Sequence, residues 1–168
     1  TTAETSGLWG TSNVSGTTYD EFTPPSEGVY TFNIPANVFR DSSDGYGNYN
    51  IASIPFTWTY DITSPSMTIT CTEVAHNTTS NDAFINMIFT STEETTTFVS
   101  GDIAVTNGTI SDFTGVSSLV YNAKFTPNGD GQCSIIVNAG SYSDTADNGN
   151  NASNQFVWTY DGTSPAMT

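Results

Sequence analysis

The residues with the clearest chemical potential are carboxylates and amides gathered in Gly-containing loops. Asp144, Asp147 and Asn150 fall within one such loop, and residues 41–48 carry a matching set. Hard cations such as Ca²⁺ bind several carboxylate, amide and carbonyl oxygens at once. Calcium is therefore one interpretation of these loops, although no twelve-residue calcium-loop motif is present. The alternative is that Asp and Asn form the turns themselves.

No set of residues predicts an enzyme. His76 is the single histidine, and it lies in a polar loop beside Asn77, where we expect an exposed residue. A catalytic base needs a nucleophile and an orienting partner. The motifs Ser-x-x-Lys, Gly-Lys-Ser/Thr and Cys-x-x-Cys do not occur. We expect no catalytic residue and no required cofactor.

Two cysteines, Cys71 and Cys133, stand 62 residues apart at strand-like positions. A disulfide closing that loop would stabilise the fold by about 4 kcal/mol through the unfolded state. An extracellular location favours the disulfide. Two buried free thiols are the alternative.

Four Asn-x-Ser/Thr sequons occur in turn-like segments where a glycan could project. They begin at Asn13, Asn77, Asn107 and Asn151. Chance is the alternative, because Asn, Ser and Thr are common in this chain. If the source is eukaryotic, we predict glycosylation of at least one of the four.

The charge balance excludes two classes of partner. With 2 Lys and Arg against 17 Asp and Glu, the net charge is −15. Nucleic acid and anionic membrane surfaces both require basic residues. No stretch has the length of a membrane span. We therefore predict an extracellular or cell-surface location, and a chain whose leader, anchor and further repeats lie outside these residues.

An internal repeat organises the chain. Residues 56–68 and 156–168 align at an offset of 100 with ten of thirteen positions identical. In each copy Phe, Trp and Tyr alternate with polar residues, as in a strand buried on one face, and Asp, Thr, Ser and Pro then end the strand. A repeat of this length is one small domain per period. We predict domains at 1–64 and 65–168.

The first domain is predicted to be incomplete. Phe22-Thr23-Pro24 aligns with Phe125-Thr126-Pro127, so residues 66–103 have no counterpart before Thr1. These residues include two predicted strands, and their absence would expose an aromatic face containing Phe22, Phe32 and Phe56. The missing strands either lie outside this chain or come from another chain. Strand addition to an open sheet edge is a known route to polymerisation.

The second domain shows the pattern of an all-β sandwich. We predict strands at 66–73, 83–91, 102–106, 118–125, 132–138 and 153–160, with turn signals between them. A helical turn is conceivable at residues 93–98, but the Thr-rich composition argues against a long helix. Trp58 and Trp158 are predicted core residues.

The order of short motifs resembles the bacterial-type immunoglobulin-like repeats of large surface proteins and adhesins. The motifs are Ile88-Phe89-Thr90, residues 98–108, Tyr121, Phe125-Thr126-Pro127, Val137, Ala139-Gly140, Asp144, Gly149-Asn150 and Trp158-Thr159-Tyr160-Asp161. The resemblance implies tandem immunoglobulin-like β-sandwiches. It also implies a possible calcium ligand at each linker, Asp61 and Asp161.

Two functions are compatible with these observations. The first is a structural extracellular module that forms a rod, fibre or filament, with copies of itself or adjacent repeats as partners. Short Thr-Ser-Pro linkers would restrict bending. The alternative is an adhesin domain that recognises a glycan or a protein through loop residues such as Trp9, Tyr46 and Tyr49.

Overall fold

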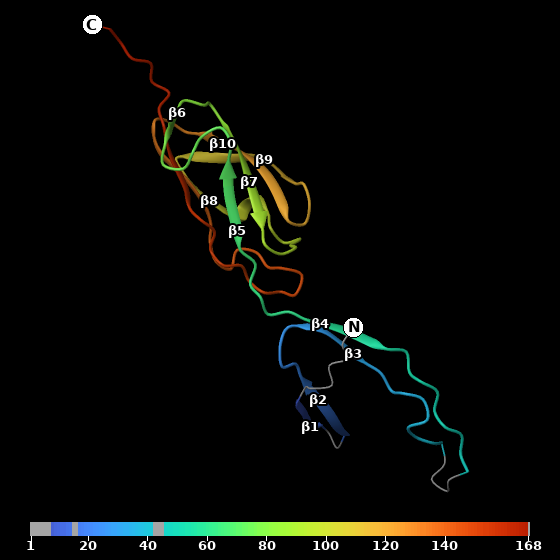
Figure 1. Ribbon diagram of the computed structural model, residues 1–168. Coiled ribbons are helices and arrows are strands. Elements are labelled where there is room, and N and C mark those ends of the chain that lie inside the picture. The colour runs from blue at the N-terminus through green and yellow to red at the C-terminus, as the bar shows by residue number, and fades with distance from the viewer. Residues whose placement is uncertain (1–7, 15–16, 42–45, 168) are drawn as a thin grey trace. The chain divides into compact units, whose positions relative to one another are not determined.

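The computed structural model describes residues 8–14, 17–41 and 46–167, with side chains described from residue 22 onward. Within these ranges the protein is built of β-strands, and its helical content is one three-residue 3-10 turn, η1 (Ser100–Asp102). The chain forms two compact units, Thr1–Ile62 and Thr63–Thr168 (Figure 1). The predicted all-β class is confirmed.

The second unit is a sandwich of two four-stranded sheets. One sheet has the spatial order β5 (Met67–Cys71), β7 (Ile85–Ser91), β10 (Val120–Pro127) and β9 (Gly108–Gly115). The other has the order β6 (Thr79–Ser80), β12 (Phe156–Tyr160), β11 (Gly131–Val137) and β8 (Ile103–Thr106). Neighbouring strands are antiparallel, except that the short β6 is parallel to β12. Two such sheets packed face to face define a β-sandwich.

The core of the second unit lies between its two sheets. Trp158 is 1 % exposed and meets the ring of Phe125 edge to face, with 4.7 Å between ring centroids. Apolar side chains at alternate strand positions fill the rest of this space: Met67, Ile69, Ile85, Met87, Phe89, Cys133, Ile135, Val137 and Phe156. Full burial of one large apolar side chain contributes about 1.5–3 kcal/mol. Burial of the apolar side chains at alternate strand positions is thus the main source of stability of this unit.

Each of the six predicted strands overlaps an observed one, but β6 and β9 were not predicted. The apolar residues of β9 do not alternate, because Ile110 and Phe113 both pack against the core although they are three positions apart. Asp112 has a left-handed backbone (φ 52°), and the register between β9 and β10 shifts at this point. This β-bulge adds one residue to β9 and returns Phe113 to the interior.

The first unit contains two separate two-stranded antiparallel sheets. They are formed by β1 (Leu8–Val14) with β2 (Thr17–Thr23), and by β3 (Gly28–Phe32) with β4 (Phe56–Tyr60). Trp9, predicted to lie in a loop, is part of β1. The β3–β4 ladder has the register of the β11–β12 ladder, since Tyr30 lies opposite Trp58 as Cys133 lies opposite Trp158.

The loops that follow β3 and β11 also share one hydrogen-bonded frame. The Nδ2 atom of Asn50 donates to the Pro35 carbonyl at 2.8 Å, and that of Asn150 donates to the Asn138 carbonyl at 2.8 Å. The Oδ1 atom of each asparagine accepts a backbone N–H group of its own loop. Because one amide side chain satisfies both donors and acceptors of the loop backbone, it holds each loop in the same shape.

Candidate functional site

An aromatic face on the first unit is the strongest candidate for a binding surface. Side chains from β2, β3 and β4 form it: Phe22, Tyr30, Phe32, Phe56 and Trp58. Their ring centroids are 5.2 Å apart for Phe22–Tyr30, 5.0 Å for Phe22–Phe32, 6.1 Å for Phe32–Phe56 and 6.2 Å for Tyr30–Trp58. The structure therefore brings together the three predicted assembly residues, Phe22, Phe32 and Phe56, in one chain of ring contacts.

This aromatic face is covered unevenly. Tyr30 is 5 % exposed, whereas Phe56 is 63 % exposed and Trp58 36 %. Their counterparts in the second unit, Phe156 and Trp158, are 5 % and 1 % exposed. The prediction that Trp58 is a core residue is wrong, because its burial depends on strands that the described part of the first unit does not contain.

The second unit shows which strands are involved. There β7 pairs with β10, β5 pairs with β7, and their inward residues Met67, Ile69 and Met87 belong to the same core cluster as Phe156 and Trp158. In the described part of the first unit, β2 pairs with β1 alone and β4 with β3 alone. One layer of the sandwich over the aromatic face is therefore absent from the described residues.

The carboxylates among the predicted calcium ligands do not form one cluster. Among the described residues, the carboxylates of Asp144, Asp147 and Asp161 do not all lie within 4.8 Å of one another. Asp147 and Asp161 are exposed, and an Asp161 carboxylate oxygen accepts the Thr163 N–H at 3.2 Å. Both polar atoms of the Asn150 side chain bind the loop backbone. Calcium binding stays a prediction.

Asp144 instead organises its own loop. It is 5 % exposed and accepts hydrogen bonds from the backbone of Ala146 at 2.7 Å, and from the backbone and side chain of Asn148 at 2.9 Å each. Burial raises the pKa of this carboxyl, but the hydrogen bonds that it accepts from Asn148, Ala146 and the Glu93 carboxyl outweigh burial and lower the pKa. These hydrogen bonds fit the interpretation that Asp144 forms the turn of its own loop.

The structure holds Cys71 and Cys133 as free thiols on opposite sheets, so the predicted disulfide is not present in it. The Sγ atom of Cys71 donates to a Glu73 carboxylate oxygen at 3.1 Å, and that of Cys133 donates to the Asn107 carbonyl at 3.4 Å. Burial is the largest influence on both thiols and raises the pKa of each.

The sequons differ in how free their acceptor amides are. Asn77 is exposed in a loop, and Asn151 is exposed with a long contact of 3.4 Å from its Nδ2 atom to the Ser64 carbonyl. Asn107 is half-buried, and its Nδ2 atom donates to the Gly129 carbonyl at 2.8 Å. Asn13 lies in β1, and its side chain is outside what the structure describes. Asn77 and Asn151 are thus the acceptors best suited to carry a glycan.

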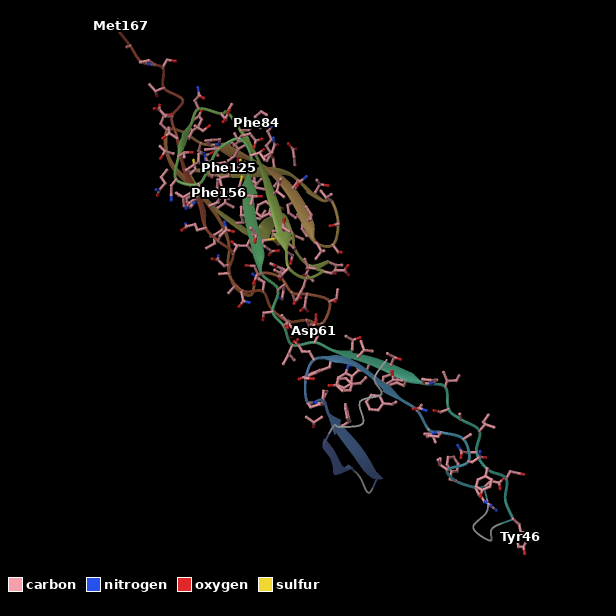
Figure 2. All side chains as sticks on the ribbon, viewed as in Figure 1. Tyr46, Asp61, Phe84, Phe125, Phe156 and Met167 are labelled. Carbon is pink, nitrogen blue, oxygen red and sulfur yellow. The ribbon has the colours of Figure 1, made fainter. Side chains whose placement is uncertain are left out.

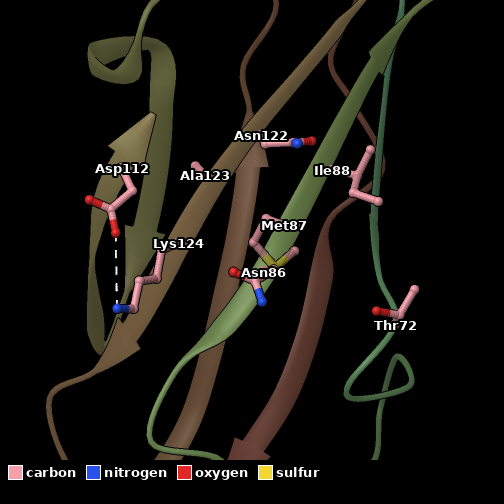
Figure 3. A pocket seen from close by; sticks show the side chains of 8 residues that line it. All are labelled: Thr72, Asn86, Met87, Ile88, Asp112, Asn122, Ala123 and Lys124. Carbon is pink, nitrogen blue, oxygen red and sulfur yellow. Dashed lines mark ion pairs between the residues drawn. The ribbon is translucent and has the colours of Figure 1, made fainter. Parts of the chain in front are cut away.

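A groove of about 250 Å³ crosses the outer face of the β5–β7–β10–β9 sheet (Figure 3). Its lining residues are Thr72, Asn86, Met87, Ile88, Asp112, Asn122, Ala123 and Lys124. The Nζ atom of Lys124 lies 3.9 Å from a carboxylate oxygen of Asp112 and 4.0 Å from the ring centroid of Phe84. The bulge at Asp112 places that carboxylate beside Lys124. Sequence reasoning missed this groove, since it depends on a register shift.

Glu73 lies beside the groove and is held by its neighbours. The Nδ2 atom of Asn86 donates to the Glu73 carboxylate at 2.7 Å, and the Cys71 thiol donates to its other oxygen. Burial raises the pKa of the Glu73 carboxyl, but the hydrogen bonds from Cys71 and Asn86 outweigh it and lower the pKa to about 2.

A carboxylate also binds the chain just beyond the last strand of each unit. Asp130 accepts the backbone N–H of Gly162 at 2.6 Å, and Glu27 accepts the backbone N–H of Ile62 at 2.8 Å. Both acids precede the aligned glycines that begin β11 and β3. The repeated acidic turn in the sequence was the available signal for these two contacts.

The remaining candidates show no catalytic arrangement. His76 is exposed, and its Nδ1 atom accepts the backbone N–H of Val157 at 3.1 Å, so it fixes a turn. Tyr46 and Tyr49 are 93 % and 50 % exposed, and Figure 2 shows Tyr46 at the far end of its loop. Arg40 lies over the Tyr49 ring at 4.0 Å. In the part of the chain that the structure describes, no helix has the length and apolar character needed to cross a membrane.

The fold and its surfaces define a β-sandwich module of the immunoglobulin-like class. Residues 61–160 match the family model described as a bacterial Ig-like domain, and the chain belongs to this family. Comparisons with curated proteins and with solved structures found no match. Domains of this family are structural or surface modules, are typically not enzymes, and commonly occur in surface proteins.

Proposed function

We propose that this chain is a structural part of an extracellular protein with tandem immunoglobulin-like units, which together form a rod or fibre. The observation that carries this proposal is the frame shared by the two units. The register of β3–β4, the amide of Asn50 and the carboxylate of Glu27 recur as β11–β12, Asn150 and Asp130. A hydrogen-bonded frame that recurs in both units holds each unit in a similar shape, which is what a repeated structural module requires.

The linker chemistry supports a stiff connection between units. Pro65 fixes its own backbone and biases Ser64 towards an extended conformation. Pro65 is also fully buried, and its carbonyl accepts the backbone N–H of Asn151 at 2.8 Å. The segment that enters the second unit is therefore held by that unit.

The surface chemistry supports an extracellular location. Arg40 and Lys124 are the only Arg and Lys residues in the sequence, so trypsin-like proteases have few cleavage sites. The net charge of −15 keeps such a surface soluble. Glycans on Asn77 and Asn151 would add steric protection in a eukaryotic source.

The maximum dimension of the protein in solution tests the proposal that the units form a rod. Small-angle X-ray scattering of this chain, and of two copies fused head to tail, should show a maximum dimension that roughly doubles. A control fusion with Glu27→Ala and Asp130→Ala should be shorter on average, because its linkers are released. A doubled chain that stays as compact as the single one would contradict the proposal. Native material should show a regular axial repeat by negative-stain imaging.

A second candidate function is glycan recognition by an adhesin. The Phe84 ring is 46 % exposed next to the groove, whose amides and carboxylate–lysine pair suit a polyhydroxylated, uncharged ligand. An anionic ligand is disfavoured by the net charge. Glycan-array binding that is lost in Asn122→Ala and Phe84→Ala, and kept in Tyr46→Ala, would favour this function. An array without signal would contradict it.

A further inference from the structure

Equivalent aromatic residues are exposed in the first unit and buried in the second. Phe56 and Trp58 lie opposite Phe32 and Tyr30 in the β3–β4 ladder, as Phe156 and Trp158 lie opposite Ile135 and Cys133 in the β11–β12 ladder. Their exposed fractions nevertheless fall from 63 % to 5 % at the Phe position and from 36 % to 1 % at the Trp position. The ladders share one register, so the covering layer makes the difference.

In the second unit that layer includes the strand pair β5–β7, whose residues are uncharged and largely alternate between buried apolar and exposed polar positions. Residues of β5 and β7 alternate between buried and exposed, with Met67, Ile69, Ile85, Met87 and Phe89 buried. The outward positions carry Thr and Asn, together with one partly buried Ile, and neither strand contains a charged residue. Figure 2 shows Phe125 and Phe156 within the body of this unit.

The first unit has an equivalent strand edge at which such a strand pair could add. In the second unit, β7 pairs with the edge of β10 that faces away from β9. The corresponding edge of β2 has no strand beside it in the described residues. Such an edge presents main-chain donors and acceptors for an added strand, while the side-chain surface beside it confers specificity.

We infer that the aromatic face binds an uncharged β-strand pair of the β5–β7 type, supplied by a polypeptide segment other than these 168 residues. The inference rests on the proposed tandem-unit function and names the partner of one surface in it. Covering Phe56 and Trp58 to the extent seen in the second unit would bury roughly 200 Å² of aromatic surface. An uncharged strand pair also avoids repulsion from a chain with a net charge of −15.

The strand pair of a second copy is not the donor. Its own β5 and β7 contribute Met67, Ile69 and Met87 to the core cluster that contains Trp158, so removing them would expose that cluster. The partner therefore carries a further example of the same alternating pattern. Face-to-face pairing of two aromatic faces is the competing arrangement, and it is an outcome of the test.

The test uses the full chain and a synthetic peptide of residues 65–92. Binding is followed by calorimetry and by a blue shift of tryptophan emission. We expect saturable one-to-one binding that weakens at least tenfold for Trp58→Asp and is unchanged for Thr59→Asp, which adds the same charge on the other side of β4. A peptide with Ile85→Asp and Met87→Asp should not bind, and this control leaves the protein unaltered.

Three results would overturn the inference: no binding by the unaltered peptide, equal loss in Trp58→Asp and Thr59→Asp, or a dimer of the chain alone that Trp58→Asp dissociates. Amide exchange of the β3–β4 ladder in each variant reports whether the first unit remains folded. If Trp58→Asp unfolds the ladder, the test is the comparison of the unaltered peptide with the Ile85→Asp, Met87→Asp peptide, both measured on the unaltered chain. If the peptide does not bind but the fused chain still doubles in length, this inference is rejected and the proposed function is not.

Discussion

The carboxylate of Asp130 accepts a hydrogen bond from the backbone N–H of Gly162 at 2.6 Å, and it also accepts one from the hydroxyl of Thr163. Glu27 makes the corresponding bond to Ile62 in the first unit at 2.8 Å. Each carboxylate ties the chain that leaves a unit to the turn that opens its neighbouring strand. Side chains of two different acids thus perform the same task at aligned positions.

We predict that release of this contact depends on pH. The hydrogen bond from Thr163, followed by that from Gly162, lowers the pKa of the Asp130 carboxyl. The contact is then fully present above the ordinary pKa of Asp and is lost as pH falls through the lowered value. The protection factor of the Gly162 amide, its intrinsic exchange rate divided by the observed rate, should fall over that acidic range, and in Asp130→Ala it should be low at every pH. An exchange profile of Asp130→Ala that equals the wild-type profile would contradict the assignment, and Asp147→Asn is the matched control.

Substitution of the two equivalent tryptophans should have unequal effects. Trp158→Ala removes a side chain that is 1 % exposed and packs on Phe125, so we expect a loss of about 3–5 kcal/mol in unfolding free energy of the second unit. Trp58→Ala removes a side chain that is 36 % exposed, so the loss in the first unit should be clearly smaller. Urea unfolding followed by circular dichroism measures both. Equal losses would mean that Trp58 is covered in solution.

Gly108 should not tolerate a side chain. A Cβ atom there would lie 2.0 Å from the Phe125 ring, which has no free space in the core. We expect Gly108→Ala to destabilise the second unit by about 1–3 kcal/mol through overpacking. Gly129→Ala is the control, because a Cβ atom there meets no atom within 4 Å. Thermal unfolding of both variants checks the prediction, and recovery in the double variant Gly108→Ala, Phe125→Leu would locate the clash.

The loop asparagines should contribute according to their burial. Asn150 is 3 % exposed and uses both side-chain atoms on the backbone, so Asn150→Ala leaves buried polar groups unpaired and should cost about 2–4 kcal/mol. Asn50 makes the same bonds at a half-buried position, where water can replace them more easily, and Asn50→Ala should cost less. Chemical denaturation compares the two. A larger effect at Asn50 would contradict this ranking.

The two thiols should be slow to react. Burial raises the pKa of both the Cys71 and Cys133 thiols, and Cys133 is fully buried. Labelling at neutral pH should therefore be slow in the folded protein, slowest at Cys133, and rapid after unfolding. If the disulfide suggested by the sequence forms in native material, neither residue will be labelled after unfolding without reductant. Mass spectrometry of labelled peptides distinguishes these states.

Local periodicity in the sequence predicted six strands of the second unit, although not β6 and β9, and the order of short motifs indicated the family. Alternation around Met67 and Ile69 predicted β5, and the aligned Phe-x-Trp-x-Tyr segments predicted β4 and β12. These features depend on residues a few positions apart, because the backbone of a strand turns each successive side chain to the opposite face.

The tertiary structure alone decided which of those residues are buried. Trp58 and Trp158 lie in closely similar stretches of sequence, yet one is partly exposed and the other is enclosed, since burial depends on strands that come from distant residues. The bulge at Asp112 and the separate partners of Cys71 and Cys133 arise in the same way. Sequence periodicity predicts on which face of a strand a side chain lies, whereas the packing of a second sheet determines whether that face is buried.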